Sequence, residues 1–145
     1  MKHYGDITKL SGYELPIVDV ITGGSPCQDL SVAGNRAGLA GERSGLFMEQ
    51  IRIVKEMREH DRELHSGRTD EFTRPRYMVW ENVPGALSSG VPKGGDFQAV
   101  LTEIIKIAQS DAPDVPIPEG GVAKVRTPLR CGNGRITFFR GMAYT

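Results

Sequence analysis

The sequence predicts an α/β domain whose strands run parallel in a single sheet. Two short apolar runs with β-branched residues are each followed by a loop and then by apolar residues at helical spacing, so the expected order is strand, helix, strand, helix. Right-handed crossovers place two such strands in one sheet. The length of 145 residues, with 39% hydrophobic and 25% charged residues, fits one ordinary globular domain.

The first strand is expected at residues 17–22, a β-branched apolar run typical of a buried strand. Glycines follow it at once, and six of them lie from Gly23 to Gly45. Loops of this length without secondary structure of their own are uncommon and often functional. We therefore expect functional residues in this loop.

The first helix is expected at residues 45–59, with Ser44 as its N-cap. Its apolar positions near a 3.6-residue period include Leu46, Phe47, Ile51 and Val54. Its predicted i,i+4 ion pairs are Arg52 with Glu56 and Lys55 with Glu59. The polar segment 60–74 is expected to form an exposed loop.

A second strand is expected at residues 76–81, followed by a turn at 82–85. A second helix then begins, with Asp96 as its expected N-cap. Its apolar face comprises Phe97, Val100, Leu101, Ile104, Ile105 and Ala108. Residues 111–121 contain three prolines and two adjacent glycines, which predict a linker or extended arm, and residues 136–139 have weak strand character.

Charge, cysteine content and hydropathy give no support for several classes of protein. The formal net charge is zero, whereas a free-standing nucleic-acid binder usually carries a basic excess. Cys27 and Cys131 form neither a CxxC pair nor the spacing of a zinc site, so no metal centre is expected. The chain has no signal-peptide pattern at its N-terminus and no apolar run long enough for a membrane span. We expect a cytoplasmic protein with free thiols.

Two reactive side chains are predicted at the carboxyl ends of the strands, where open α/β sheets bind ligands. Cys27 follows the first strand in a glycine-rich loop, where nearby backbone N–H groups can lower a thiol pKa and favour the nucleophilic thiolate. Glu81 ends the second strand and can donate a hydrogen bond if burial raises its pKa. From position alone, a structural cysteine and a solvated carboxylate are the favoured readings.

Three short stretches resemble the DNA cytosine-5 methyltransferase family. Residues 23–31 contain Pro26-Cys27-Gln28, similar to the family's catalytic signature. Residues 41–47 resemble the end of its mobile catalytic loop, and Glu81-Asn82-Val83 matches its Glu-Asn-Val signature. The signatures occur in the family's order and spacing, and the resemblance extends from about residue 4 to residue 108, roughly two-thirds of the chain.

The resemblance implies an incomplete Rossmann-like methyltransferase fold and methyl transfer from S-adenosylmethionine to C5 of cytosine. Duplex DNA is the implied partner, with the target cytosine flipped out of the helix. Cys27 would add to C6 of the ring, and a protonated Glu81 would bind N3. Such covalent catalysis divides one hard step into two easier ones and needs no metal.

Supporting roles follow from the same resemblance. Pro26 would shape the loop near the cofactor, and Asn82 would hold that loop by hydrogen bonds. The residues expected to approach DNA are Gln28, Ser31 and Arg43. Asp6 is similar to the family's acidic residue near the cofactor adenine, although an aspartate in an N-terminal turn is an almost equal alternative.

The chain also departs from the family. It contains no Phe-x-Gly-x-Gly cofactor loop, no Gln-x-Arg-x-Arg segment and no large target-recognition region. We therefore expect residues 1–109 to be a partial catalytic domain, residues 110–145 to be a linker with a divergent tail, and the chain alone to have little activity. The enzyme would belong to a restriction-modification system or to a phage. The chain would be a truncated product or one half of a split enzyme that needs a complementing half.

Two alternatives stay open. The first is a non-catalytic methyltransferase remnant that dimerises or associates with DNA. An exposed apolar surface or an unpaired strand edge would favour such self-association. The second is an unrelated thiol enzyme that pairs Cys27 with a histidine, the candidates being His3, His60 and His65.

Overall fold

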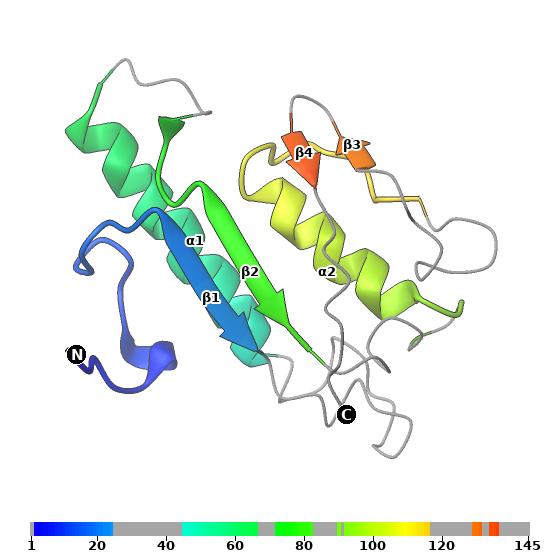
Figure 1. Cartoon of the computed structure of the whole chain (residues 1–145), viewed down its shortest axis with the longest axis horizontal. Coiled ribbons are helices and arrows are strands. Elements are labelled where there is room, and N and C mark those ends of the chain that lie inside the picture. The colour runs from blue at the N-terminus through cyan, green and yellow to red at the C-terminus, as the bar shows by residue number, and fades with distance from the viewer. Residues whose placement is uncertain are drawn as a thin grey trace, which may run out of the picture.

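The computed structural model describes residues 2–24, 45–66, 72–82, 90, 92–116, 129–131 and 134–136. Its elements in chain order are the 3₁₀ helix η1 (Ile7–Lys9), β1 (Val20–Gly24), α1 (Gly45–Leu64), β2 (Tyr77–Glu81), α2 (Gly95–Lys106), β3 (Leu129–Cys131) and β4 (Gly134–Ile136) (Figure 1). The predicted order of strand, helix, strand and helix is therefore confirmed.

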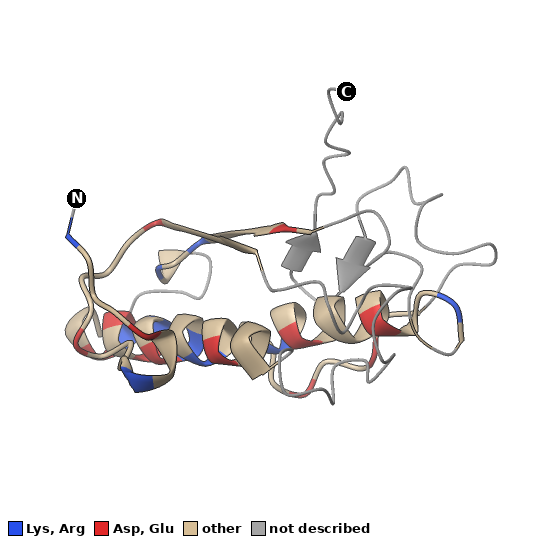
Figure 2. Cartoon of the chain, turned by 90° about the horizontal axis from the view of Figure 1, so that it is seen from below, with Lys and Arg blue, Asp and Glu red and all other residues tan. Residues whose placement is uncertain are grey.

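β1 and β2 form a parallel two-stranded sheet, as the sequence predicts. The register runs from Val20 opposite Tyr77 to Gly24 opposite Glu81. Figure 2 shows α1 and α2 on the same side of these two strands. The described chain is thus an α/β arrangement of two layers, with both helices covering one face of the sheet.

The core lies between the two helices and the covered face of the sheet. α1 contributes Phe47 and Ile51, and α2 contributes Val100 among others, each of these three being 1% exposed. Trp80 of β2 joins the helices because its ring packs edge-on against Phe47, with centroids 6.2 Å apart, and stacks on Phe97 at 5.8 Å. These aromatic contacts add to the burial that holds the layers together.

The prediction that the first strand is buried is wrong for one of its two faces. β1 begins at Val20, and exposed and half-buried residues alternate along both strands. Val20 is 48% exposed and Val79 is 52% exposed. The reason is tertiary, since side chains alternate across a strand and, in the described chain, helices cover only one face.

The prediction that residues 60–74 form an exposed loop is wrong for the two ends of that range, and its residues 67–71 lie outside the described part of the chain. α1 continues to Leu64, and both Asp61 and Thr73 are completely buried. The backbone N–H of Arg74 donates to the Asp61 carboxylate at 2.9 Å, and the Arg74 guanidinium pairs with the same group. The sequence predicts that the Asp61 carboxylate is exposed to solvent. It is buried because Arg74 neutralises its charge.

The ion pairs predicted on α1 are partly confirmed. Arg52 pairs with Glu56 at 2.8 Å, as expected for i,i+4 spacing. Lys55 instead lies 3.8 Å from Glu103 of α2, and the Glu59 carboxylate accepts a hydrogen bond from the Tyr13 hydroxyl. The predicted cap, Ser44, lies outside the described residues.

α2 begins differently from the prediction but buries the predicted face. Its N-cap is Gly94, with a left-handed φ of 91°, a conformation that favours glycine, and Asp96 lies in the first turn. The buried members of the face are Phe97, Val100, Leu101 and Ile105. Ala108, at the far end of the predicted face, is exposed.

The described residues that follow α2 pack back onto it. Ala112 and Val115 are 5% and 3% exposed and belong to the core. The N–H of Val115 donates to the Thr102 hydroxyl at 3.1 Å, and its carbonyl accepts from the Gln98 amide at 2.6 Å. The domain boundary at residues 109 and 110 stays a prediction.

The tail contains an antiparallel pair of short strands. β3 pairs with β4, with Leu129 opposite Ile136. The weak strand predicted at residues 136–139 overlaps β4 only at Ile136, and its remaining residues lie outside the described part of the chain.

Candidate functional site

β1 and β2 end side by side, at the edge of the sheet where the sequence predicts a site. Gly24, the last residue of β1, lies opposite Glu81, the last residue of β2. The first turns of α1 and α2 lie toward the same edge (Figure 1). Strand ends and helix N-termini therefore converge, as they do where α/β sheets bind ligands.

The Glu81 side chain lies against the end of β1. A Cβ atom built on Gly24 would lie 2.8 Å from Glu81 Oε2 and 3.2 Å from the Glu81 backbone oxygen. Glycine at position 24 thus leaves the space that the Glu81 carboxyl group occupies. Glu81 is itself exposed, so the described residues do not supply the burial on which the predicted hydrogen-bond donation depends, and its carboxyl group can be reached by a ligand at this edge.

Most of the predicted site residues lie outside the described part of the chain. These are Pro26, Cys27, Gln28, Ser31 and Arg43. Among those described, Asn82 follows Glu81 directly and is half-buried. The structure thus places one member of the predicted catalytic pair, Glu81, beside the strand that leads to the other.

Asp6, the predicted cofactor residue, is exposed and caps η1. Its Oδ1 accepts hydrogen bonds from the backbone N–H of Thr8 at 3.0 Å and from the Thr8 hydroxyl at 2.9 Å. The bond from the Thr8 N–H is the main reason that the pKa of the Asp6 carboxyl lies below its ordinary value. Asp6 therefore stays ionised over a wider range of acid pH than an ordinary aspartate.

Gln50 of α1 is a site residue that the sequence analysis missed. It is 8% exposed and lies against Gly23, the neighbour of Gly24 in β1. A signal was present in the sequence, because Gln50 lies three residues after Phe47 and so falls on the apolar face of the helix. Core packing favours an apolar residue on that face, so packing alone does not explain a glutamine there.

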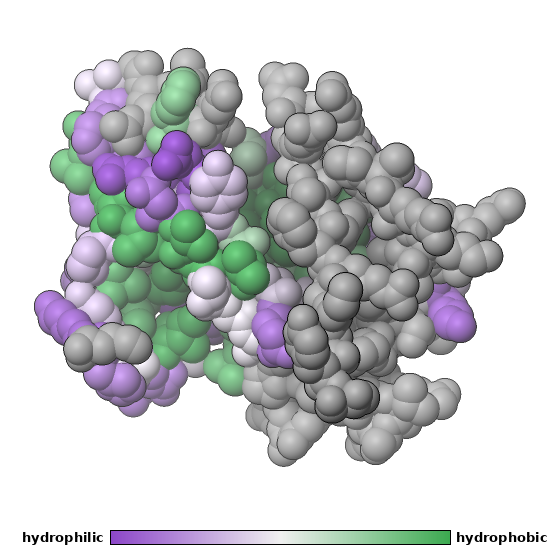
Figure 3. All heavy atoms as spheres, viewed as in Figure 1, coloured by the Kyte–Doolittle hydropathy of each residue, from purple (hydrophilic) through white to green (hydrophobic). Residues whose placement is uncertain are grey.

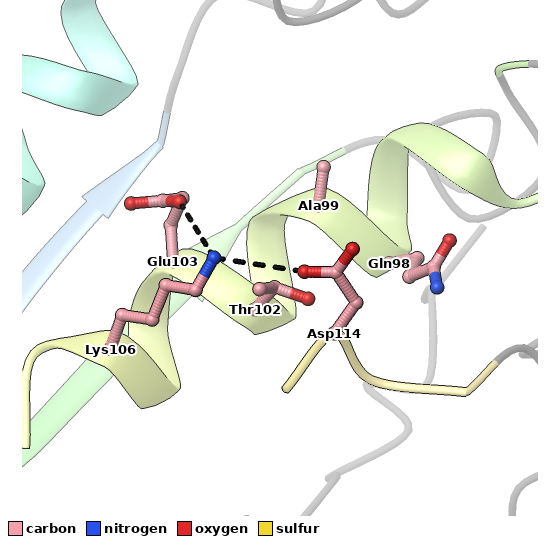
Figure 4. A pocket seen from close by; sticks show the side chains of 6 residues that line it. All are labelled: Gln98, Ala99, Thr102, Glu103, Lys106 and Asp114. Carbon is pink, nitrogen blue, oxygen red and sulfur yellow. Dashed lines mark ion pairs between the residues drawn. The ribbon is translucent and has the colours of Figure 1, made fainter. Parts of the chain in front are cut away.

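A shallow groove on α2 lies apart from these residues. It is lined by Gln98, Ala99, Thr102, Glu103, Lys106 and Asp114 (Figure 4). Lys106 Nζ lies 3.9 Å from Glu103 and 3.6 Å from Asp114, so the charged side chains of the groove are engaged with one another. The groove is therefore a weaker candidate than the edge of the sheet.

The described residues contain no group of three or more His, Cys, Asp or Glu side chains arranged to hold a metal ion. Within the same part of the chain, neither helix combines the length and apolar character that a membrane span requires.

Comparisons with known proteins point to DNA methylases. The model of the family described as C-5 cytosine-specific DNA methylase matches residues 1–108. Type II methyltransferase M1.ScrFI of Lactococcus lactis subsp. cremoris is 46% identical over 101 residues, which cover 70% of this chain and 21% of the relative. Type II methyltransferase M.BsuFI of Bacillus subtilis is 29% identical over 124 residues, 81% of this chain and 26% of the relative.

A third relative is named for methylation of a different base. It is a DNA N-6-adenine-methyltransferase of Escherichia phage P1, 37% identical over 123 residues, which cover 81% of this chain and 15% of the relative. The matched segment thus spans between 15% and 26% of these three relatives.

Proposed function

We infer that this chain, which belongs to the C-5 cytosine-specific DNA methylase family, carries the nucleophile and the acid of a DNA cytosine-5 methyltransferase. The observation that supports this proposal most is the position of Glu81 opposite Gly24 at the end of β1. Gly24 precedes Cys27 by three residues, and three residues of chain span at most about 11 Å. The length of chain therefore allows both proposed groups to act at one edge of the sheet.

The proposed reaction begins when the Cys27 thiolate forms a carbon–sulfur bond to C6 of a flipped cytosine. The Glu81 carboxyl group donates its proton toward N3 and so takes up the negative charge that the attack places on the ring. C5 becomes nucleophilic and accepts the methyl group. A solvent base then takes the C5 proton, N3 returns its proton to Glu81, and cleavage of the carbon–sulfur bond restores the aromatic ring and the Cys27 thiolate.

S-adenosylmethionine would supply the methyl group. Among the described residues, the one candidate for its binding is Asp6, whose exposed carboxylate is already engaged with Thr8. That single residue does not make a cofactor site, so the described residues support no further cofactor contact. Pro26 is proposed as a second cofactor neighbour on the family resemblance alone.

The remaining residues of the signatures would support the reaction. We assign Asn82 to holding the Cys27 loop, because it directly follows Glu81 and is half-buried. Gln28, Ser31 and Arg43 would contact the DNA, with Arg43 suited to a phosphate.

Cytosine is the favoured base, although one relative is named an adenine methyltransferase. Addition of a thiolate to a ring carbon activates C5 of a pyrimidine. Methylation of an exocyclic amino group requires no such covalent adduct, because the amino nitrogen itself attacks the methyl group. A cysteine in the proposed nucleophile position therefore favours cytosine as the methylated base.

The test uses a chimera, because the chain spans a small part of its relatives and we expect it to transfer little methyl by itself. Residues 1–108, which the family model matches, would replace the corresponding segment of the Lactococcus lactis enzyme, and methylation would be followed with labelled S-adenosylmethionine. We expect the chimera to methylate cytosine, Cys27→Ser to abolish product, and Glu81→Gln to lower the rate about 100-fold or more.

The matched control is a carboxylate on α2, replaced as Glu103→Gln, which should leave the rate near that of the chimera. DNA with 5-fluorocytosine should trap a covalent adduct in the chimera but not in its Cys27→Ser variant. An active Cys27→Ser chimera, or a product methylated on adenine, would contradict the proposal.

A second candidate function rests on the open face of the sheet. Val20, Tyr77 and Val79 are 48%, 61% and 52% exposed, an apolar surface of the kind that associates in water. A non-catalytic remnant that dimerises through this face would show twice the chain mass in light scattering. Val79→Lys should then restore the monomer without unfolding the chain.

A further inference from the structure

β1 ends in two glycines whose side-chain space is filled from opposite faces of the sheet. Successive residues of a strand point to opposite faces. The space at Gly24 is occupied by the carboxyl group of Glu81, and the space at Gly23 is occupied by the amide of Gln50. The end of the strand is therefore held between a proposed catalytic group and a side chain of α1.

The contact at Gly23 is tight. A Cβ atom built there would lie 2.8 Å from both Cδ and Oε1 of Gln50, with Nε2 closer still. Real Cβ atoms essentially never approach other atoms so closely, and the atoms met are the far end of the Gln50 side chain, so a side chain at position 23 would have to displace that buried amide. The planar amide thus lies against the Gly23 backbone and fits only because position 23 has no side chain.

The amide of Gln50 stabilises the fold less than an apolar side chain would at this position. Nε2 of Gln50 is buried and has no hydrogen-bond partner among the residues that the structure describes. A buried N–H without an acceptor destabilises the folded state, and an apolar side chain of similar size would avoid this cost. A planar group is thinner than a branched aliphatic one, however, so leucine would press β1 away from the helix.

We propose that Gln50 is a positioning residue for the methyl-transfer reaction and that it acts through Gly23. It sets how far the end of β1 lies from α1, and thereby where Gly24 lies relative to Glu81. It also sets the point at which the chain leaves the sheet toward Cys27. This inference rests on the proposed function, but its geometric part can be tested without activity.

The first test is a double-mutant cycle read by the single tryptophan of the chain. Trp80 lies opposite Gly23 in the sheet, so its fluorescence reports on this contact. Gly23→Ala should shift the Trp80 emission, because the new methyl group presses β1 away from α1. Gln50→Ala should shift it in the opposite sense, because the end of β1 then moves toward α1, and the double variant should return toward the original spectrum because the smaller side chain makes room for the methyl group.

The second test reads the chemistry. Alkylation by iodoacetamide, followed by peptide mapping, gives separate rates for Cys27 and Cys131. Gly23→Ala should change the Cys27 rate about tenfold, which corresponds to the coupling expected of residues in contact. The Cys131 rate should not change, and Gln50→Ala in the Gly23→Ala background should recover most of the Cys27 rate.

Gln50→Leu separates positioning from stability. It removes the buried unpaired N–H, so the denaturation midpoint should stay level or rise. It should nevertheless shift the Trp80 emission and alter the Cys27 rate and its dependence on pH. If Gly23→Ala fails to fold, this variant and Gln50→Ala still decide the question.

Gly95→Ala is the matched control, because a Cβ atom at Gly95 would meet Pro92 Cδ at the ordinary contact distance of 3.8 Å and no other described atom within 4 Å. The inference is overturned if Gly23→Ala behaves like this control. It is also overturned if the double variant is no closer to the original than Gly23→Ala, or if Gln50→Leu leaves both readouts unchanged. A chimera that forms no adduct with 5-fluorocytosine DNA would contradict the proposed function. The fluorescence double-mutant cycle does not depend on that result, because it tests only the contact between Gln50 and Gly23.

Discussion

At the scale of single residues, buried charges join the end of α1 to the start of β2. Asp61 is fully buried and accepts from the backbone and the guanidinium of Arg74. Arg58, 6% exposed, donates to the carbonyls of Thr73 at 2.6 Å and Pro75 at 2.7 Å. These contacts hold the segment that enters β2 and so contribute to the position of the strand that carries Glu81.

Removal of the buried carboxylate should therefore be costly. We expect Asp61→Ala to lower the free energy of unfolding by about 3 kcal/mol, because it leaves an arginine and a backbone N–H without their acceptor. The matched control is Asp19→Ala, which removes an exposed pair with Arg76 (51% and 41% exposed) and should cost under about 1 kcal/mol. Urea denaturation measures both, and equal losses would contradict the assignment.

At the scale of elements, the N-terminal segment is held on α1 by polar contacts. The Arg52 guanidinium donates to the carbonyls of Ile7 at 3.1 Å and Leu10 at 2.9 Å. The N–H of Gly12 donates to the Glu56 carboxylate at 2.7 Å. Gly12 also packs directly on the helix, since a Cβ there would lie 2.6 Å from the Ile53 carbonyl oxygen. The segment that contains Asp6 is thus anchored to the helix.

This anchor should weaken in acid. Burial by itself raises the pKa of the Glu56 carboxyl, but the hydrogen bond from Gly12 and the charge of Arg52 outweigh burial and lower it below its ordinary value of 4.5. The stabilisation is therefore present above pH 4.5 and is lost as the pH falls through the lowered pKa. The Gly12 amide resonance in NMR should titrate with a midpoint below 4.5.

The comparison variant is Glu56→Gln, in which the acid titration of the Gly12 resonance should disappear. A midpoint at or above 4.5 in the unaltered chain would show that the carboxylate is not stabilised by these partners.

At the basic end of the pH range, the hydrogen bond to Glu59 raises the pKa of Tyr13 to about 12. That contact therefore stabilises the fold below pH 10 and is lost as the pH rises through 12.

At the scale of the whole molecule, the described chain is two-layered, with one open face. Parallel sheets are usually covered on both faces, yet here both helices lie on the same side (Figure 2). Figure 3 shows hydrophobic residues gathered over the strands on the other side. The exposed apolar residues at the strands are Val18, Val20, Tyr77 and Val79. This arrangement is an incomplete form of the α/β methyltransferase fold.

The two faces should respond differently to one substitution. Val100→Ala removes methyl groups from a residue that is 1% exposed and should cost about 2 kcal/mol. Val79→Ala changes a residue that is 52% exposed and should cost under about 0.5 kcal/mol. Thermal or urea denaturation of both variants decides the matter. A large loss for Val79→Ala would mean that the open face is covered in solution.

Local patterns predicted much of the fold and part of the site. The apolar face of α2 is confirmed at Phe97, Val100, Leu101 and Ile105, because helical periodicity depends on neighbouring residues alone. The pair Arg52–Glu56 was predictable for the same reason. Glu81 was expected at the end of a strand and lies there. The catalytic roles of Cys27 and Glu81 stay predictions.

The sequence by itself determined the order of β1, α1, β2 and α2 and the family, because periodicity and short motifs are properties of nearby residues. It also determined the parallel pairing of the two strands, because a helix connects them. Only the tertiary structure decided that Asp61 is buried, that Gln50 lies against Gly23, and that one face of the sheet is open. Each of these depends on which distant residue arrives beside a side chain, and burial, charge neutralisation and close packing are set by that partner.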